Sequence, residues 1–470
     1  VPAAEDPFGV GWEDRSLFQP AVIDKDVFDD LTGATVYHLD VVVSPDLDVL
    51  EGREWIRYTN QESVQLEEIY FQLFANVTGG STAVSSVSVE GESVDPVVES
   101  SGQTLRVPLS DPLRPGDATT LQLDFTVQLS QDAETSYGVL GYFDDFLLLD
   151  GFYPVVLVYD DEGWNVEDLV PIGDMAYLDS SFFLVRVTAP RDLDLVASGT
   201  ETQRDRVGRS QVVSFAIGPA RDFYLAAAPD LEVFTSQSGK STINSYGRSE
   251  DHDGAERAMQ FAVDAMALFG ERLGPYQYTE FDVIGTPMRA LGIEYPGATT
   301  ISIVMYDLGA EVAGLPAAIM LEGTVVHEVA HQWFYNVVGN DQIDEPWLDE
   351  AMAQYLTGLY YREMYGDQAE QDYRQSWTDR WDRIGGELIP IGLPTNGYTP
   401  EQYSPIVYGR GPLFLAALED QMGRDTFAEF LRDYYQSNIW AIVTGNDFRA
   451  TAERHCQCDL AEMFAEWVGG

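Results

Sequence analysis

The sequence predicts a multi-domain chain in which an all-β domain precedes an α+β domain that is mainly helical. Two observations predict this order. Short runs of β-branched and aromatic residues, separated by turn residues, recur over residues 36–217. From residue 316 onward, apolar residues at helical spacing dominate. Strands first and helices later are typical of an all-β domain followed by an α+β domain. We place the boundary near residue 233, which gives domains 1–233 and 234–470.

The composition supports this size and excludes several classes of partner. The 470 residues are 45% hydrophobic and 12% aromatic, enough for large packed cores. No run of about 20 apolar residues occurs, so we expect no membrane-spanning helix. The net charge is −52 and is spread along the chain, as in a solvated acidic surface. Such a surface repels phosphates, so we expect neither nucleic acid nor an anionic membrane as a partner.

The β-rich half follows an irregular lead-in of about 30 residues that is rich in Asp, Pro and Phe. Its strands are expected at residues 36–43, 54–59, 67–74, 104–109, 120–129, 182–188, 193–197 and 212–217. Short strands with turn signals over some 200 residues indicate a β-sandwich or a broad curved sheet. His38 lies in a strand pattern, and we interpret it as structural.

The second half opens with a helix and then returns to strands. Residues 255–273 carry apolar side chains three and four apart, and the Gly-Pro pair that follows ends this pattern. Residues 281–284 and 299–305 are buried strands by composition. The helical stretch after them, at residues 324–355, carries the clearest chemistry in the chain.

Residues 327–331 read His-Glu-Val-Ala-His. On a helix, residues four apart lie on one face, so His327 and His331 can bind one zinc ion. Glu328 stands beside them, where a carboxylate can take a proton from metal-bound water. Glu350 follows His331 after eighteen residues and can supply the third protein ligand if a second helix returns antiparallel. Residues 339–346 contain Gly, Asn, Asp and Pro and are a plausible connection between the helices.

A short motif of this kind also arises by chance, as two exposed histidines on an amphipathic helix. The chain has only five histidines, and two of them lie here at ligand spacing. The surrounding helix is otherwise apolar, and unpaired polar groups are costly to bury there. The sequence therefore predicts a site for one zinc ion per chain.

With Trp-Leu-Asp-Glu-Ala-Met-Ala-Gln-Tyr around Glu350, this segment resembles the aminopeptidase N-like gluzincins, peptidase family M-one. Asp349 and Ala351 flank Glu350, where the family usually reads Trp-Leu-Asn-Glu-Gly. The resemblance implies a saddle-shaped β-domain and a thermolysin-like catalytic domain. It also implies zinc-dependent removal of N-terminal residues from peptides that have a free N-terminus.

Residues 291–297 are similar to the exopeptidase motif Gly-Ala-Met-Glu-Asn of this family. Gly292 and Glu294 match its glycine and glutamate, while Tyr295 stands where asparagine is usual. The resemblance implies that Glu294 holds the charged amino terminus of the substrate by a charge-assisted hydrogen bond. A second amine-binding group from the β-domain is usual in the family, and Glu167 is the residue considered for it.

Tyr408 stands where the family has a Tyr-x-Lys-Gly motif, with Arg410 in place of the lysine. The resemblance implies that the phenol stabilises the oxyanion, while Glu328 acts as general base and later passes the proton to the leaving amine. We expect Arg410 to be a local ion-pair partner.

Two other functions stay open. One is a thermolysin-like endopeptidase, which would have the same zinc site but no recognition of the substrate amino terminus, because Glu294 would not face the metal. The other is a catalytically inert binding protein, which would retain the fold and a bound zinc ion but have no activity. The intact set of zinc-binding and catalytic residues favours an enzyme, because a relic site is expected to lose at least one of them: His327, Glu328, His331, Glu350 and Tyr408.

The ends of the chain carry weaker signals. Cys456 and Cys458 either form a small disulfide or remain thiols, and three ligands in four residues rarely close a second metal site. The chain starts at Val1 rather than Met, so we expect an extracellular or cell-surface protein without its signal, with the cytoplasm as the alternative. The resemblance continues through residues 422–468 without the family's large C-terminal helical domain, which implies an open cleft. The sequence does not give the oligomeric state.

Overall fold

The computed structural model describes residues 6–133 and 137–469, so the first five residues of the expected lead-in lie outside the described residues. The chain forms two compact units, and each contains segments that are distant in sequence. Unit 1 consists of Val1–Leu169, Leu178–Met259 and Gln277–Ala318. Unit 2 consists of Val170–Tyr177, Gln260–Tyr276 and Ile319–Gly470.

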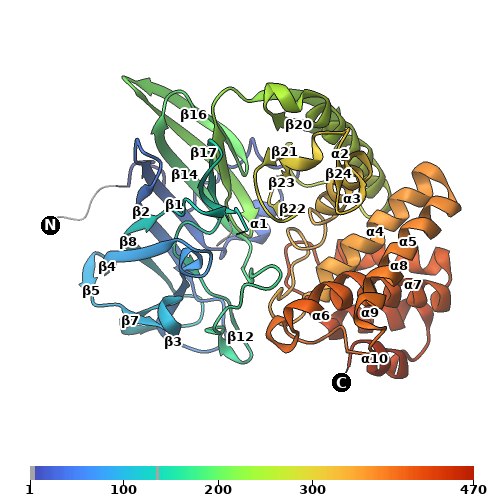
Figure 1. The fold of residues 1–470 in the computed structure, drawn as a ribbon. Helices are drawn as coiled ribbons and strands as arrows, with labels where there is room; N and C mark the ends of the chain where they lie inside the picture. The colour runs from blue at the N-terminus through green and yellow to red at the C-terminus, as the bar shows by residue number, and fades with distance from the viewer. Residues whose placement is uncertain (1–5, 134–136, 470) are drawn as a thin grey trace. The chain divides into compact units, whose positions relative to one another are not determined.

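Unit 1 is built on an eight-stranded sheet with the strand order β16-β17-β14-β1-β2-β8-β4-β5 (Figure 1). β1 and β14 pair in parallel, and the other neighbours pair antiparallel. Along β8, buried residues alternate with partly buried ones, which shows that one face of this sheet packs more deeply on the core. The strands are β1 (Val36–Val43), β2 (Val49–Thr59), β4 (Ser81–Val89), β5 (Glu92–Val94), β8 (Ala118–Gln128), β14 (Ser181–Pro190), β16 (Thr200–Val207) and β17 (Ser210–Ala220).

Two four-stranded sheets complete the β-rich part, which confirms the predicted all-β start of the chain. Their orders are β15-β18-β10-β9 and β11-β3-β7-β6. The first consists of β9 (Leu140–Phe143), β10 (Phe146–Leu149), β15 (Asp194–Ala197) and β18 (Leu225–Ala228). The second consists of β3 (Leu66–Gln72), β6 (Val97–Glu99), β7 (Thr104–Leu113) and β11 (Val155–Val156). A short hairpin joins β12 (Tyr159–Asp160) to β13 (Gly163–Trp164).

A five-stranded sheet with the order β19-β20-β21-β23-β22 forms the rest of unit 1. The expected strand at 299–305 is shorter, because the chain turns after Ser302. β22 pairs antiparallel with β23 at one edge. The strands are β19 (Glu232–Ser238), β20 (Ser241–Gly247), β21 (Glu280–Thr286), β22 (Gly292–Tyr295) and β23 (Ala298–Ser302). Smaller elements of this unit are α1 (Val27–Asp30), β24 (Glu311–Val312) and β25 (Leu315–Pro316).

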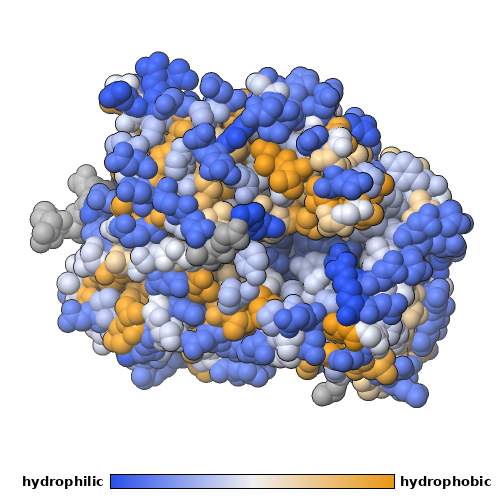
Figure 2. Space-filling model, in the orientation of Figure 1, coloured by the Kyte–Doolittle hydropathy of each residue, from blue (hydrophilic) through white to orange (hydrophobic). Residues whose placement is uncertain are grey.

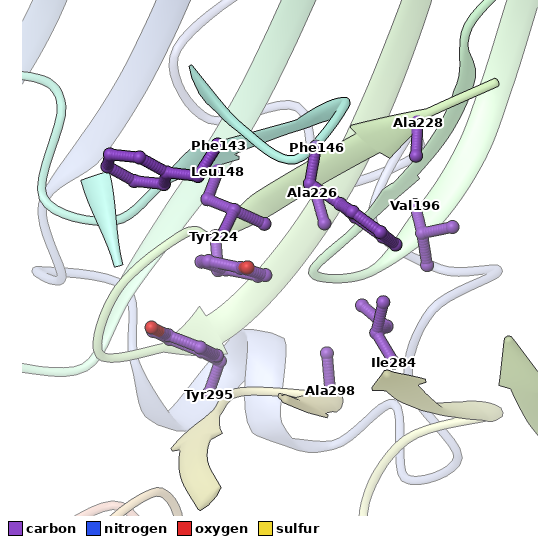
Figure 3. Close-up of a cluster of buried hydrophobic side chains, with 10 residues drawn as sticks. All are labelled: Phe143, Phe146, Leu148, Val196, Tyr224, Ala226, Ala228, Ile284, Tyr295 and Ala298. Atoms are coloured by element: carbon purple, nitrogen blue, oxygen red, sulfur yellow. The ribbon is translucent and has the colours of Figure 1, made fainter. Parts of the chain in front are cut away.

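A buried hydrophobic cluster joins the five-stranded sheet to the sheet that contains β10 and β18 (Figure 3). Its centre is the pair Tyr224 and Tyr295, whose rings stack with centroids 3.9 Å apart and planes 8° apart. Phe146 and Leu148 of β10 and Ala298 of β23 surround this pair. The cluster therefore fixes β22, and with it the segment that contains Glu294, against the β-rich part of the same unit.

Unit 2 is helical, as predicted. α2 (His252–Arg272) begins in unit 1 and ends in unit 2, and the remaining helices run from residue 317 to residue 467. They are α3 (Ala317–Ala330), α4 (Trp347–Tyr365), α5 (Asp367–Trp381), α6 (Pro400–Pro405), α7 (Gly411–Met422), α8 (Arg424–Ser437), α9 (Gly445–Cys456) and α10 (Ala461–Trp467). Across the described parts of the chain, no helix has both the length and the apolar character needed to span a bilayer.

The surface carries many hydrophilic residues (Figure 2), and the two cysteines near the end of the chain are bonded to each other. Hydrophilic residues cover much of the face drawn in Figure 2, in keeping with the net charge of −52. Cys456 and Cys458 form a disulfide, so the pair does not offer free thiolates to a metal.

Candidate metal centre

The side chains of His327, His331 and Glu350 converge in unit 2. The Nε2 atoms of the two histidines lie 3.2 Å apart, and Nε2 of His327 lies 3.1 Å from Oε2 of Glu350. Nε2 of His331 lies 3.5 Å from the same oxygen. All three side chains are buried, and their ligand atoms lie within 4.8 Å of one another. Two imidazoles and one carboxylate that leave a fourth position open are the donor set of a catalytic zinc site.

Local structure explains why these three residues meet. His327 lies in the last turn of α3, and His331 follows directly after the helix end, so both point the same way. The carboxylate of Asp341 then accepts hydrogen bonds from the backbone N–H groups of Ile343 and Asp344, at 2.8 and 3.0 Å. This is a turn that a short acidic side chain favours. The chain reverses here as predicted, and α4 begins at Trp347 with Glu350 in its first turn.

Further hydrogen bonds orient the ligand side chains. Nδ1 of His331 donates to the carbonyl oxygen of Phe334 at 3.1 Å, which leaves its Nε2 lone pair for a metal. Burial alone would raise the pKa of Glu350, but its interactions with the adjacent His327 and His331 hold it well below the usual range. Burial also lowers the pKa of His327, which favours the neutral imidazole that a metal ligand requires.

Asp349 explains the departure from the sequence Trp-Leu-Asn-Glu-Gly. Its Oδ1 accepts a hydrogen bond from the Asn340 amide at 3.0 Å, and its Oδ2 accepts one from the Gln342 amide at 2.7 Å. Its Oδ2 also lies 4.0 Å from Nδ1 of His331. Two donors that approach two different oxygens require a carboxylate, because an asparagine would present an NH2 group to one of them. Asp349 therefore anchors the connection between α3 and α4 behind the histidines.

Tyr408 reaches this centre from a π-helical turn at Ile406–Arg410, between α6 and α7. Its hydroxyl donates a hydrogen bond to Oε1 of Glu350, and its ring centroid lies 6.0 Å from that of His327. Pro405 precedes the turn and has no N–H to donate, which favours a wider local turn. Burial and the charge of Glu350 raise the pKa of Tyr408 well above its ordinary value, so its phenol remains a hydrogen-bond donor.

Arg410 does not form the expected ion pair. Its guanidinium donates hydrogen bonds to the carbonyl oxygens of Ile389, Glu466 and Trp467, at 2.9, 2.9 and 2.6 Å. Two of these carbonyls belong to the last turn of α10, where carbonyl groups lack helical partners. Arg410 therefore fixes the end of α10 against the segment that carries Tyr408.

The other predicted residues have definite places in the fold. Glu328 follows His327 on α3 and is buried. Gly292 and Glu294 lie on the edge strand β22 of unit 1, where Glu294 pairs with Thr299 of β23. Glu294 is buried, whereas Glu167 is exposed.

Asp150 is a residue that the sequence analysis missed. It directly follows β10 and is half-buried. Burial and the nearby charge of Glu294 raise its pKa to about 7, while the Tyr295 hydroxyl opposes this shift. Two carboxylates therefore lie close together in unit 1. The only sequence signal is an acidic residue at the end of the apolar run 146–149.

Comparisons with known proteins agree with this picture. Residues 257–467 match the peptidase family M1 domain. Aminopeptidase 2 of Candida albicans is 21% identical over 457 residues, which are 93% of this chain and 47% of that protein. A probable aminopeptidase 2 of Sulfurisphaera tokodaii is 23% identical over 321 residues, which are 65% of this chain and 40% of that protein. The chain thus spans less than half the length of these curated relatives.

Solved structures resemble the chain over nearly its whole length. The crystal structure of an M1 zinc metallopeptidase from Deinococcus radiodurans has a TM-score of 0.67 at 22% identity, covering 97% of this chain and 95% of that one. A mutant of this metallopeptidase bound to a Tyr-Ser-Ala substrate has a TM-score of 0.66 at 22% identity, covering 93% and 94% of the two chains. These similarities establish that the chain shares the fold of these structures.

Proposed function

We propose that this chain is a zinc-dependent aminopeptidase of the M1 type that removes N-terminal residues from peptides. The match of residues 257–467 to the peptidase family M1 domain and the similarity to Aminopeptidase 2 of Candida albicans support this proposal. The observation that carries this proposal is the convergence of His327, His331 and Glu350 with the Tyr408 hydroxyl. These donors match a catalytic zinc site in number and type. Zinc, when bound, lowers the pKa of a water molecule and polarises the scissile carbonyl.

The chain's own residues supply the remaining steps. The carboxylate of Glu328 accepts a proton from the attacking water and passes it to the nitrogen of the leaving amine. As negative charge develops on the oxygen of the scissile carbonyl, the hydroxyl of Tyr408 exchanges its hydrogen bond to Glu350 for one to that oxygen. The raised pKa of Tyr408 supports this role, because a phenol that is ionised could not donate.

In this proposal the substrate's amino terminus is held by acidic groups of unit 1. Glu294 is the first, and Asp150, with a pKa near 7 and close to Glu294, is the second. An ammonium ion between two carboxylates relieves their mutual repulsion and forms charge-assisted hydrogen bonds. A single ammonium group at this place would restrict cleavage to the first peptide bond. We also propose that the protein works outside the reducing cytosol, which the Cys456–Cys458 disulfide supports.

A test compares one short peptide in free and N-acetylated form, in the presence of zinc. We expect the first residue to be released from the free form alone. Cleavage of both forms would instead identify an endopeptidase and remove the role of Glu294. No cleavage of either form over a range of salt concentrations and N-terminal residues would favour a binding protein. Glu328→Gln is the matched control, because it keeps the shape of the site but loses the base.

A further inference from the structure

A positively charged side chain lies next to the metal centre within unit 2. Arg380, in the last turn of α5, places its Cζ 5.5 Å from the centroid of the Tyr408 ring. The Tyr408 ring in turn lies 6.0 Å from the ring of His327. Burial lowers the pKa of Arg380, while the nearby Glu350 carboxylate partly offsets this effect.

A glycine in the π-helical turn explains how Arg380 comes so close. A Cβ atom at Gly409 would lie 3.0 Å from the carbonyl oxygen of Trp377 and 3.1 Å from the backbone nitrogen of Trp381. It would lie 3.5 Å from Cβ of Arg380. Only a residue without a side chain therefore allows the turn that carries Tyr408 to pack directly on the end of α5. The fold thus holds Arg380 beside the catalytic phenol.

The charge of Arg380 is not balanced by a carboxylate partner. Within residues 6–133 and 137–469, the side chain of Arg380 forms no hydrogen bond or ion pair. The contrast with Arg374, six residues earlier on the same helix, is clear, because Arg374 binds the buried carboxylates of Glu370 and Glu419 at 2.6 and 2.7 Å. The neighbouring cation Arg383 lowers the pKa of Arg380 further.

An unbalanced pair of cations is unusual in this chain, where acidic residues outnumber Lys and Arg by 78 to 26. The contact with the Tyr408 ring offsets part of the hydration that this half-buried guanidinium loses, but it leaves the N–H donors available to an acceptor. Its planar fork of N–H donors matches a carboxylate, which it can bind through two parallel hydrogen bonds. A substrate carboxylate that reaches the region next to Tyr408 would match this fork.

We propose that Arg380, assisted by Arg383, binds the C-terminal carboxylate of a short peptide substrate. This inference rests on the proposed aminopeptidase function and narrows its substrate class. An extended peptide advances about 3.3–3.6 Å per residue, so one or two residues after the scissile bond bring the carboxylate into the region beside Tyr408. Dipeptides and tripeptides with free C-termini are therefore the preferred substrates.

The net charge of the whole protein allows a local effect of Arg380 to be distinguished from the long-range electrostatic attraction of substrates. A net charge of −52 attracts cationic substrates and repels anionic ones. The overall field therefore favours a peptide amide over the corresponding free acid. A preference for the free acid requires a local cation that overcomes this field.

The experiment measures KM for a tripeptide and for its C-terminal amide, in the wild type and in Arg380→Gln. We expect the wild type to have a KM about tenfold lower for the acid, the low end of what a hydrogen bond to a charged group provides. In Arg380→Gln the KM for the acid rises until acid and amide no longer differ. Arg206→Gln, which removes the same charge from the exposed strand β16, keeps the difference.

A binding measurement separates failure of this inference from failure of the proposed function. Isothermal titration calorimetry of the Glu328→Gln variant gives Kd for the acid and the amide without turnover. We expect tighter binding of the acid, and loss of this preference when Arg380→Gln is added. Equal Kd or KM values for acid and amide in the presence of Arg380 would overturn the inference. An equal weakening of both by Arg380→Gln would assign the residue a structural role. Absence of hydrolysis together with tighter binding of the acid would refute the aminopeptidase but keep the carboxylate site.

Discussion

The hydroxyl of Tyr408 donates a hydrogen bond to the carboxylate of Glu350, a side chain of the metal centre. The phenol is thereby held beside the three side chains proposed to bind zinc. Oε2 of Glu350 also lies 3.1 Å from Nε2 of His327, so the position of the carboxylate does not depend on Tyr408 alone. The phenol can therefore be removed without dismantling the centre.

Tyr408→Phe is expected to lower kcat by about 10²–10³-fold, the effect of removing one preorganised oxyanion donor. Zinc content should remain at one ion per chain, because the three ligand side chains are retained. Steady-state kinetics combined with metal analysis of the purified variant checks both points. Loss of zinc, or a kcat near that of the wild type, would contradict the assigned role.

Asp349→Ala is expected to weaken zinc binding by about 10–100-fold, because outer partners of a metal site orient its ligands. The change leaves the buried amides of Asn340 and Gln342 without their acceptor. Competition with a chelator of known affinity measures the effect. Asp372→Ala, at an exposed position on α5, serves as the control and should bind zinc as the wild type does. Equal affinity in both variants would show that Asp349 is only a structural residue.

Asp150 predicts a pH dependence of substrate binding. Its pKa of about 7 means that it gains a proton as the pH falls below 7, which removes one of the two carboxylates near the substrate ammonium. KM for peptides with a free N-terminus should therefore rise below pH 7. In Asp150→Asn the KM should be high at every pH and no longer change in this range. An unchanged pH profile in the variant would assign the titration to another group.

Glu54 predicts a pH dependence of stability. Its carboxylate lies fully buried in β2, and neither oxygen has a hydrogen-bond partner in the described part of the chain. Burial raises its pKa well above 4.5 in the folded protein, so the folded state retains a proton that the unfolded chain releases. This group therefore favours folding below the unfolded pKa and opposes it progressively as the pH rises.

Glu54→Gln, which resembles the protonated acid, should raise the melting temperature at pH 8 and leave it almost unchanged at pH 4. Thermal unfolding followed by circular dichroism at both pH values measures the difference. Glu51→Gln, at an exposed position of the same strand, is the matched control. An equal change at both pH values would show that protonation of Glu54 is not the cause.

The metal centre could be predicted because its geometry is largely local. A four-residue spacing on a helix places His327 and His331 on one face whatever the rest of the fold does. Glu350 needed only a chain reversal, and the turn residues between the helices signalled it. The strands of the β-rich part were predictable for the same reason, since alternation of side chains is a local property.

The remaining partners could not be predicted because they depend on contacts that periodicity does not encode. Asp150 and Glu294 are far apart in sequence and meet because β10 and β22 pack through one hydrophobic cluster. Tyr295 stands where asparagine is usual in the family motif. Its stacking on the ring of Tyr224 could be seen only in the structure. Arg410 was expected to pair with a carboxylate, but it donates to the carbonyl groups of Glu466 and Trp467 at the end of α10. The sequence around Arg410 carries no signal for this contact, because α10 lies more than fifty residues further along the chain.

The π-helical turn at Ile406–Arg410 has a consequence for how this activity can be lost. Each residue of an α-helix rotates the chain by about 100°, so deletion of one residue here would restore a regular helix and turn the phenol away from Glu350. Every side chain named in the mechanism would still be encoded. An in-frame deletion of one codon would thus abolish the proposed activity while all sequence motifs remain. The number of residues in this turn is therefore as informative about activity as the motifs themselves.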